Sequence, residues 1–312
     1  MDEYVLRTIN LTKRFGQKNV VDHLNLNIKK GDIYGFIGPN GAGKTTAMKL
    51  VLSLLDPTSG EIELFGKRNN RQALRKVGSL IEAPGLYTNC TALENMRRFA
   101  ILCGGTETEI IELLRMVGLG MVGSQKVKSF SLGMKQRLGI AIALLGHPEL
   151  FVLDEPVNGL DPMGMRDVRD IILRINQQMG VTFFISSHLL GELEKISTVY
   201  GIIRQGVLSE EITAAELANM RKNSHAGSLG NIRVRCSRPE DAAELLRQNF
   251  GFMQIKIMGE VVDIQADISA SAEINKALVL AGIDVMELGT NSAGYEDYFI
   301  QRMGIAPVQG RC

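Results

Sequence analysis

A short glycine-rich segment contains the residue types and spacing best suited to chemistry. Residues 38–45 read Gly-Pro-Asn-Gly-Ala-Gly-Lys-Thr, and a second threonine follows. Glycines let successive backbone N–H groups turn inward around an anion, and a helix that begins at Lys44 adds the positive end of its dipole. Lys44 can reach the β- and γ-phosphates of a triphosphate, and the Thr45 hydroxyl can bind Mg²⁺. The segment therefore predicts a nucleotide-phosphate site formed by Gly38, Pro39, Asn40, Gly41, Ala42, Gly43, Lys44, Thr45 and Thr46.

Two acidic residues and a histidine follow apolar stretches farther along the chain. Residues 150–153 are Leu-Phe-Val-Leu, and Asp154 and Glu155 come next. In a parallel sheet, ligands bind at the carboxyl ends of the strands. We expect Asp154 to hold Mg²⁺, mainly through water, and Glu155 to act as the general base on the attacking water. His188 follows the apolar run VTFFISS, where it can donate a hydrogen bond to the γ-phosphate.

The elements that must position these residues follow from hydrophobic periodicity. Alternating stretches predict strands with one buried face, and short apolar runs joined by a crossover helix predict a buried parallel sheet. The predicted elements are antiparallel strands within residues 1–35, a strand at 32–37, a helix at 44–55, helices over about 83–146, strands at 150–155 and 181–186, and a helix at 165–179.

A change of pattern after residue 220 indicates a second domain. Residues 221–230, RKNSHAGSLG, have the polar, Gly- and Ser-containing composition of a linker. Beyond them the predicted order is β-α-β-β-α-β, typical of a small ferredoxin-like α+β domain, with a further helix in GYEDYFIQRM. We therefore divide the chain into a domain at 1–220, a linker at 221–230 and a small domain at 231–312.

Bulk composition restricts the classes of protein. The chain has 312 residues, 45% of them hydrophobic and 22% charged, as in ordinary globular proteins. Its net charge of +1 gives no strong field for nucleic acid or acidic lipid. Its apolar runs are much shorter than the roughly 20 residues of a membrane helix, and its start does not have the pattern of a signal peptide. The four cysteines lack a CxxC spacing, which predicts reduced thiols in a cytosolic protein.

A segment upstream of the two acids resembles a family signature. Residues 129–137, SFSLGMKQR, are similar to the signature of ATP-binding cassettes (ABC), which is usually LSGGQ followed by a basic helical segment. Ser131 and Gly133 match this signature, whereas leucine and methionine follow them in place of the usual residues. Ser131 can still cap the next helix, whose N-terminus can then face a γ-phosphate.

The resemblance covers residues 1 to about 215 and implies a fold and a ligand. The implied fold is α/β, a P-loop NTPase with a RecA-like parallel sheet core, an antiparallel β subdomain and a helical subdomain at about 83–146. The implied ligands are ATP and Mg²⁺. The resemblance also implies that Phe15 stacks on adenine and that His188 is the family's switch histidine.

The resemblance further implies an assembly. In this family two cassettes pair head to tail around two ATP molecules, so Ser131 and Gly133 would face the ATP of a partner copy. Asn158-Gly-Leu-Asp161 resembles the family's D-loop, usually SALD, which implies a role for Asp161 beside the nucleotide.

One departure concerns position 82. The family usually has glutamine where this sequence has Glu82, and we expect Glu82 to join Thr45 and Asp154 as a metal ligand. This glutamate, the SLGMKQR segment and the small C-terminal domain together are similar to the subgroup that exports bacitracin or gives immunity to lantibiotics.

The resemblance predicts an ATPase subunit of a peptide-antibiotic exporter. We expect it to form a homodimer when ATP is bound, and to dock on a separately encoded permease through the region around residues 83–100, at the cytoplasmic face of the cell membrane. Two alternatives are a soluble cassette acting on ribosomes or nucleic acid and a small-molecule phosphotransferase. The single cassette without a heptad tract or basic stripe disfavours the first. The signature segment and the Glu155/His188 pair disfavour the second.

Replacing Lys44 by alanine is expected to abolish tight ATP binding. The change removes the main cationic side chain of the loop, and a charge-assisted contact of this kind contributes roughly 1.5–3 kcal/mol. Isothermal calorimetry with ATP measures the effect, and an unchanged dissociation constant would contradict the assignment of the loop.

Overall fold

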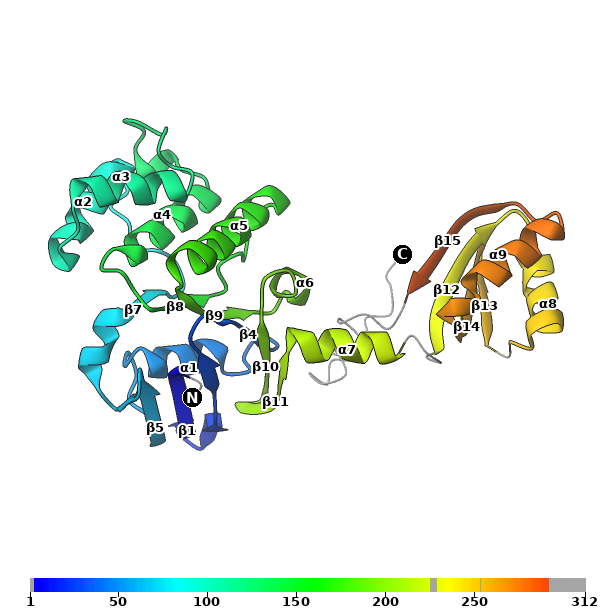
Figure 1. Ribbon diagram of the computed structural model, residues 1–312, viewed down its shortest axis with the longest axis horizontal. Coiled ribbons are helices and arrows are strands. Elements are labelled where there is room, and N and C mark those ends of the chain that lie inside the picture. Colours follow the sequence, from blue (N-terminus) through cyan, green and yellow to red (C-terminus); the bar gives the residue numbers. More distant parts are fainter. Residues whose placement is uncertain (1–2, 225–228, 253, 292–312) are drawn as a thin grey trace. The chain divides into compact units, whose positions relative to one another are not determined.

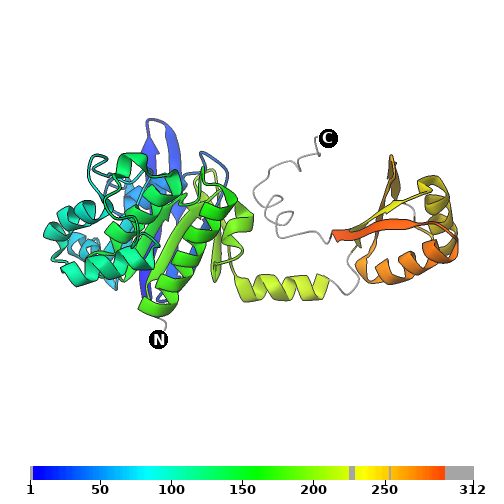
Figure 2. The same cartoon turned by 90° about the horizontal axis from the view of Figure 1, so that it is seen from above.

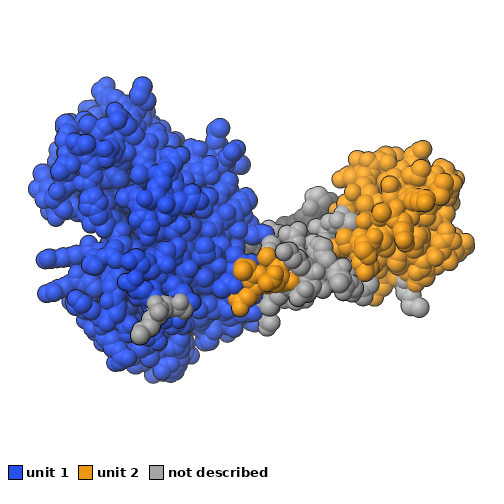
Figure 3. All heavy atoms as spheres, in the orientation of Figure 1, with its two compact units in different colours: residues 1–214 blue, residues 215–312 orange. Residues whose placement is uncertain are grey.

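The computed structural model describes residues 3–224, 229–252 and 254–291 (Figure 1). The chain divides into two compact units, unit 1 (Met1–Ala214) and unit 2 (Ala215–Cys312), coloured separately in Figure 3. Each unit has a hydrophobic core of its own.

A six-stranded sheet forms the centre of unit 1. It consists of β4 (Ile33–Ile37), β7 (Val77–Leu80), β8 (Leu150–Asp154), β9 (Thr182–Ser187), β10 (Val199–Arg204) and β11 (Val207–Thr213). The strand order is β11-β10-β4-β9-β8-β7, and every pair is parallel except β10 with β11. All residues of β4, β8 and β9 are buried, which explains why these strands are apolar runs rather than alternating ones. The predicted parallel core is confirmed.

A second, antiparallel sheet precedes and flanks the phosphate loop in the sequence. Its strands are β1 (Tyr4–Phe15), β2 (Lys18–Leu24), β3 (Asn27–Lys29), β5 (Ser59–Leu64) and β6 (Lys67–Arg68). The order is β2-β1-β5-β6, and β3 also pairs with β1. In β1 the buried residues are interrupted by partly buried or exposed ones, and the alternation that predicted strands in this region is regular only over residues 6–9.

The helices of unit 1 include the group predicted between residues 83 and 146. They are α1 (Lys44–Val51), α2 (Ala92–Cys103), α3 (Glu107–Met116), α4 (Leu132–Leu144), α5 (Pro162–Met179) and α6 (Leu190–Leu193), with 3-10 turns η1 (Arg71–Lys76) and η2 (Val127–Ser129). Figure 2 shows the same arrangement from above. None of the helices in the described part of the chain combines the length and apolar character needed to cross a bilayer.

Two helix boundaries differ from the predicted ones. Helix α1 ends at Val51 rather than at residue 55, and Ser53 just beyond has a left-handed φ of 54° that a helix cannot contain. Helix α5 begins at Pro162 rather than at residue 165. The Asp161 carboxylate accepts a hydrogen bond from the Gly164 backbone N–H at 2.9 Å and so caps this earlier start.

Unit 2 has the predicted β-α-β-β-α-β order. Its elements are β12 (Leu229–Cys236), α8 (Pro239–Phe250), β13 (Ile255–Met258), β14 (Val261–Asp267), a 3-10 turn η3 (Ile268–Ala270), α9 (Ser271–Leu280) and β15 (Val285–Asn291). The sheet order β13-β14-β12-β15 is antiparallel throughout, which agrees with a ferredoxin-like connectivity. The further helix predicted in GYEDYFIQRM lies outside the described residues.

The segment predicted as a linker is largely structured where it is described. Helix α7 (Ala214–Ser224) includes residues 221–224, and β12 already begins at Leu229. The run AAELANMRK consists mostly of good helix formers, so helix propensity continues into residues whose polar character suggested a linker.

A buried tyrosine ties two strands of the central sheet together. The Tyr34 hydroxyl on β4 donates to the Glu211 carboxylate on β11 at 2.7 Å. A side chain at Gly201 on β10 would clash with this hydroxyl, so the glycine leaves room for the tyrosine to cross. Burial raises the pKa of Tyr34 well above its usual value, and burial also raises the pKa of Glu211. Tyr34 therefore stays a neutral donor at physiological pH.

The Tyr34–Glu211 contact is expected to affect stability in a pH-dependent way. Tyr34→Phe should lower the free energy of unfolding by about 1–3 kcal/mol, because Glu211 loses a donor in a partly buried position. Since the folded-state pKa of Glu211 is raised, its favourable contribution exists below the unfolded pKa and is lost as pH rises through the folded value. Glu211→Gln should thus gain stability relative to wild type as pH rises above the ordinary glutamate pKa of about 4.3.

Urea unfolding followed by circular dichroism at several pH values measures both effects. Burial also raises the pKa of Asp32, and the Asp32 charge in turn helps to raise the pKa of Glu211, so the difference between the two proteins includes the repulsion between these carboxylates. A wild-type-minus-Glu211→Gln difference that does not change with pH would contradict the argument.

Candidate nucleotide-binding site

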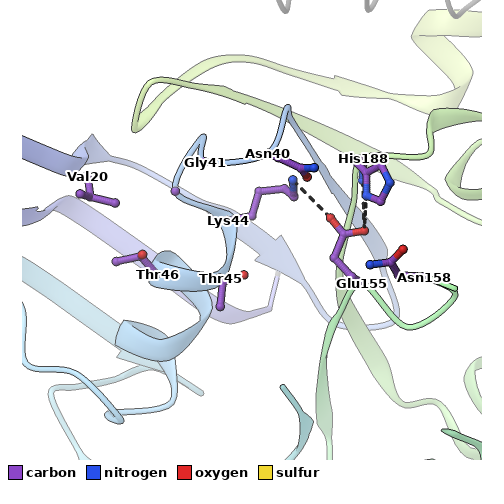
Figure 4. A pocket seen from close by; sticks show the side chains of 10 residues that line it. Val20, Asn40, Gly41, Lys44, Thr45, Thr46, Glu155, Asn158 and His188 are labelled. Carbon is purple, nitrogen blue, oxygen red and sulfur yellow. Dashed lines mark hydrogen bonds and ion pairs between the residues drawn. The ribbon is translucent and has the colours of Figure 1, made fainter. Parts of the chain in front are cut away.

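The glycine-rich loop joins β4 to α1 and lines a pocket of about 330 Å³. Gly43 has a left-handed φ of 109°, and a Cβ there would lie 2.5 Å from the Val20 carbonyl oxygen. Only glycine fits such a position. The pocket, part of which Figure 4 shows, is lined by Val20, Asn40, Gly41, Gly43, Lys44, Thr45, Thr46, Glu155, Asn158 and His188.

Lys44 is the buried cation of this pocket. Its side chain is 6% exposed, and its ammonium group donates to the Gly38 carbonyl oxygen at 2.6 Å and to the Pro39 carbonyl oxygen at 3.3 Å. The same ammonium lies 3.3 Å from Oε1 of Glu155. Carbonyl oxygens of the loop therefore hold the Lys44 ammonium at the wall of the pocket.

Glu155 connects Lys44 to His188, as Figure 4 shows. Oε2 of Glu155 lies 2.7 Å from Nδ1 of His188 and 3.3 Å from the His188 backbone N–H. Glu155 has a left-handed φ of 49°, which turns its side chain at the end of β8. A strained non-glycine residue of this kind is common at functional sites.

Asp154 is buried at the end of β8 and has two hydroxyl donors. Thr45 Oγ donates to Oδ2 of Asp154 at 2.7 Å, and Ser186 Oγ donates to Oδ1 at 2.6 Å. Hydroxyl and carboxylate oxygens are the ligand type that Mg²⁺ prefers. The Thr45–Asp154 pair therefore fits a magnesium ion, although no cluster of three or more acidic, His or Cys side chains suited to a metal occurs among the described residues.

The predicted metal ligand Glu82 and the predicted adenine contact Phe15 are among the residues that do not line this pocket. Glu82 is 67% exposed and pairs with Lys49 across 2.7 Å. Phe15 is 49% exposed at the end of β1, with the Lys13 ammonium 5.3 Å from its ring centre. The structure brings neither of them into the lining.

Ser131 of the signature segment and Asp161 of the D-loop segment cap helices within this chain. Ser131 Oγ accepts a hydrogen bond from the Met134 backbone N–H at 3.2 Å, which caps α4 as predicted. Asp161 caps α5, and Gly133 at the start of α4 has no close steric constraint. None of the three lines the pocket.

Three residues of the site were missed by sequence reasoning. Ser186 is fully buried, and besides donating to Asp154 it accepts from the Glu155 backbone N–H at 2.9 Å. Its polar side chain at the end of an apolar strand was the available signal. Asn158 lies in the segment that resembles a D-loop. Val20 reaches the pocket from β2, and nothing in the sequence marks it.

Comparison with known proteins identifies the family. The family described as ABC transporter matches residues 21–158. The bacitracin transport ATP-binding protein BcrA of Bacillus licheniformis is 41% identical over 305 residues, covering 96% of this chain and 97% of that protein. The chain belongs to the ATP-binding subunits of ABC transporters. This ATP-binding subunit is accordingly an ATPase of that family.

Other relatives and solved structures agree. BcrA of Enterococcus faecalis is 39% identical and covers 97% of each chain. The lantibiotic transport ATP-binding protein SrtF of Streptococcus pyogenes is 46% identical over 214 residues, covering 68% of this chain and 93% of that protein. The fold is that of a nucleotide-free ATP-binding cassette, with a TM-score of 0.64 at 23% identity, covering 70% of this ATP-binding subunit and 95% of that chain.

Ser186→Ala is expected to slow ATP hydrolysis while leaving ATP binding largely intact. The change removes one donor from Asp154 and one acceptor from the Glu155 backbone, so the two carboxylates lose their relative placement. A lost buried hydrogen bond of about 1–1.5 kcal/mol corresponds to roughly a tenfold drop in kcat. Ser197→Ala, which removes a buried hydroxyl outside the pocket lining, is the matched control. Equal kcat values for the two variants would contradict the role of Ser186.

Proposed function

We propose that this ATPase energises export of a peptide antibiotic of the bacitracin type. The supporting observation is the length of the likeness: the two BcrA proteins match 96–97% of this chain and 97% of their own length. The lantibiotic relative SrtF matches only 68% of this chain although 93% of SrtF is covered. The bacitracin-type relatives thus match the length of both units, whereas the lantibiotic-type relative matches only a stretch about as long as unit 1.

We further propose roles for the side chains of the pocket. Lys44 and the backbone N–H groups of the loop bind the β- and γ-phosphates of ATP. Glu155 accepts the proton of the attacking water, and His188, 2.7 Å from this carboxylate, holds it in place and donates to the γ-phosphate. Phe15 stacks on the adenine, as the family resemblance implies.

Magnesium is proposed to be held by Thr45 and Asp154. When bound, Mg²⁺ would neutralise phosphate charge. The residues of the chain position the two acids through hydrogen bonds. Thr45 and Ser186 each bond one carboxylate oxygen of Asp154, and Ser186 also bonds the backbone of Glu155. Glu82 remains a proposed additional ligand that acts from the loop after β7.

We propose that two copies pair around ATP. Ser131 and Gly133 lie at the N-terminus of α4, where helix N–H groups favour an anion, and neither lines the pocket of its own chain. A partner copy would bring them, with Asp161, to the other side of the nucleotide. A dimeric cassette bound to ADP and Pi is known for a protein whose fold this chain shares, with a TM-score of 0.60 at 24% identity, covering 67% of this chain and 98% of that one.

The proposed membrane partner is a separate permease, reached from the cytoplasmic side. The candidate surface is the segment around residues 83–100. Tyr87 in this segment is 51% exposed, and its ring packs on Phe99 and against the Arg98 guanidinium, with centroid distances of 6.0 and 5.0 Å. An exposed aromatic ring fixed by its neighbours is a typical anchor at protein interfaces.

Antibiotic resistance in the native host tests the proposal. A strain that lacks this gene is complemented with the wild-type chain or with Glu155→Gln, and growth is measured against bacitracin, a lantibiotic and an unrelated small antibiotic. We expect the wild-type chain alone to restore resistance, and to bacitracin, because Glu155→Gln binds ATP but turns it over at a rate about 10²–10⁴-fold lower.

Two biochemical measurements accompany this test. The Glu155→Gln protein should elute as a dimer in gel filtration with Mg·ATP, and the wild-type chain should sediment with membranes together with a multi-spanning protein. Resistance to the lantibiotic alone would replace the bacitracin assignment, and recovery with ribosomes instead of membranes would contradict an exporter altogether.

A further inference from the structure

An ion pair holds the unusual glutamate of this cassette. The Lys49 ammonium on α1 lies 2.7 Å from Oε1 of Glu82, within unit 1. Glu82 follows β7 and has a left-handed φ of 62°, so its backbone turns at this point. The family resemblance implies a neutral glutamine at this position, and an amide would not need a cation.

The position of the pair relates it to the site. Thr45 and Lys49 are four residues apart on α1, about one helical turn, and therefore lie on the same face. Thr45 contacts Asp154 after β8, and Lys49 contacts Glu82 after β7. Strands β7 and β8 are parallel neighbours with Leu80 opposite Leu153, so both acids leave the sheet at the same edge. Two successive turns on one face of α1 thus contact the two acids, Asp154 through Thr45 and Glu82 through Lys49.

Charge explains why a lysine is useful at this place. A glutamate in the loop adds a negative charge to an edge that already has Asp154 and Glu155, and like charges in proximity oppose one another and the phosphates of ATP. Lys49 is the only cation paired with Glu82 among the described residues. An exposed ion pair of this type contributes little to the free energy of unfolding. Breaking the Lys49–Glu82 pair should therefore leave the fold intact, and we expect its effect on the nucleotide site instead.

We propose that Lys49 is a positioning residue that lets glutamate replace glutamine at position 82. It neutralises the added charge and fixes Oε1 of Glu82 at the sheet edge from which Asp154 also leaves. This inference rests on the proposed role of the pocket in Mg·ATP hydrolysis. It predicts that Lys49 matters only while position 82 is acidic.

A double-mutant cycle tests this conditional role. Lys49→Gln, Glu82→Gln and the double variant are compared with wild type for kcat of ATP hydrolysis, for its dependence on Mg²⁺ concentration, and for ADP affinity by calorimetry with Mg²⁺ or with EDTA. We expect Lys49→Gln to lower kcat about five- to tenfold and to change the effect of Mg²⁺ on ADP affinity when Glu82 is present. In the Glu82→Gln background the same change should have less than about a twofold effect.

The chain offers a matched control at the other end of the same two strands. Lys76, just before β7, pairs with Glu149, just before β8, across 2.6 Å. Lys76→Gln breaks a similar exposed pair and should leave kcat and Mg²⁺ dependence unchanged, while Lys49→Arg should retain wild-type behaviour because it keeps the charge.

The outcomes separate this inference from the proposed function. Equal losses from Lys49→Gln in the wild-type and Glu82→Gln backgrounds, or a similar loss from Lys76→Gln, would overturn the role of Lys49 while leaving the ATPase assignment intact. Failure of the wild-type chain to hydrolyse Mg·ATP would contradict the proposed function, and the calorimetric half of the cycle would still measure the coupling between Lys49 and Glu82.

Discussion

The buried charge of Lys44 determines how the rest of the site is built. Removing an ammonium group from water costs several kcal/mol unless other groups compensate for it. The loop supplies two carbonyl oxygens, and β8 supplies the Glu155 carboxylate. A phosphate that reaches Lys44 competes with Glu155 for the same ammonium. Binding of an anion at Lys44 would therefore be linked to the placement of the Glu155 carboxylate, through one contact of 3.3 Å.

The parallel sheet is what brings these groups together. Strands β4, β8 and β9 are neighbours, and the loop, the acids and His188 each follow the carboxyl end of one of them. Because parallel strands end at a common edge, residues far apart in the sequence meet there without any long insertion. Ser186 completes this edge, since its hydroxyl is shared between Asp154 and the backbone of Glu155. The left-handed turn at Glu155 is tolerated because its N–H remains bonded.

The parts of the site that could be predicted from sequence are those whose chemistry depends on local spacing. The phosphate loop, the apolar strand before Asp154 and the cap at Ser131 each require particular residues within a few positions, and the structure contains the loop, the strand and the cap. Ser186 was not predicted because its two partners, Asp154 and the Glu155 backbone, belong to the neighbouring strand and its end. The order of strands in a sheet cannot be inferred from any single segment of the sequence.

Other differences have similar physical causes. The metal prediction for Glu82 considered the charge of the acids nearby but not a cation one turn along α1, and Lys49 is the partner that the structure shows. The linker was inferred from polar composition, yet polar residues with good helix propensity can extend a helix, as residues 221–224 do in α7. The local sequence pattern predicts a helix or strand well when it favours one conformation strongly. It predicts less well where a tertiary contact or the helix propensity of the residues opposes what their polarity suggests.

The nucleotide pocket belongs to one of the two units. Every residue that lines the pocket belongs to unit 1, and unit 2 has a hydrophobic core of its own. SrtF, whose match to this chain is 214 residues long and covers 93% of SrtF, has little room for a second unit. The two BcrA proteins, in contrast, match nearly the full chain and so include unit 2 in the match.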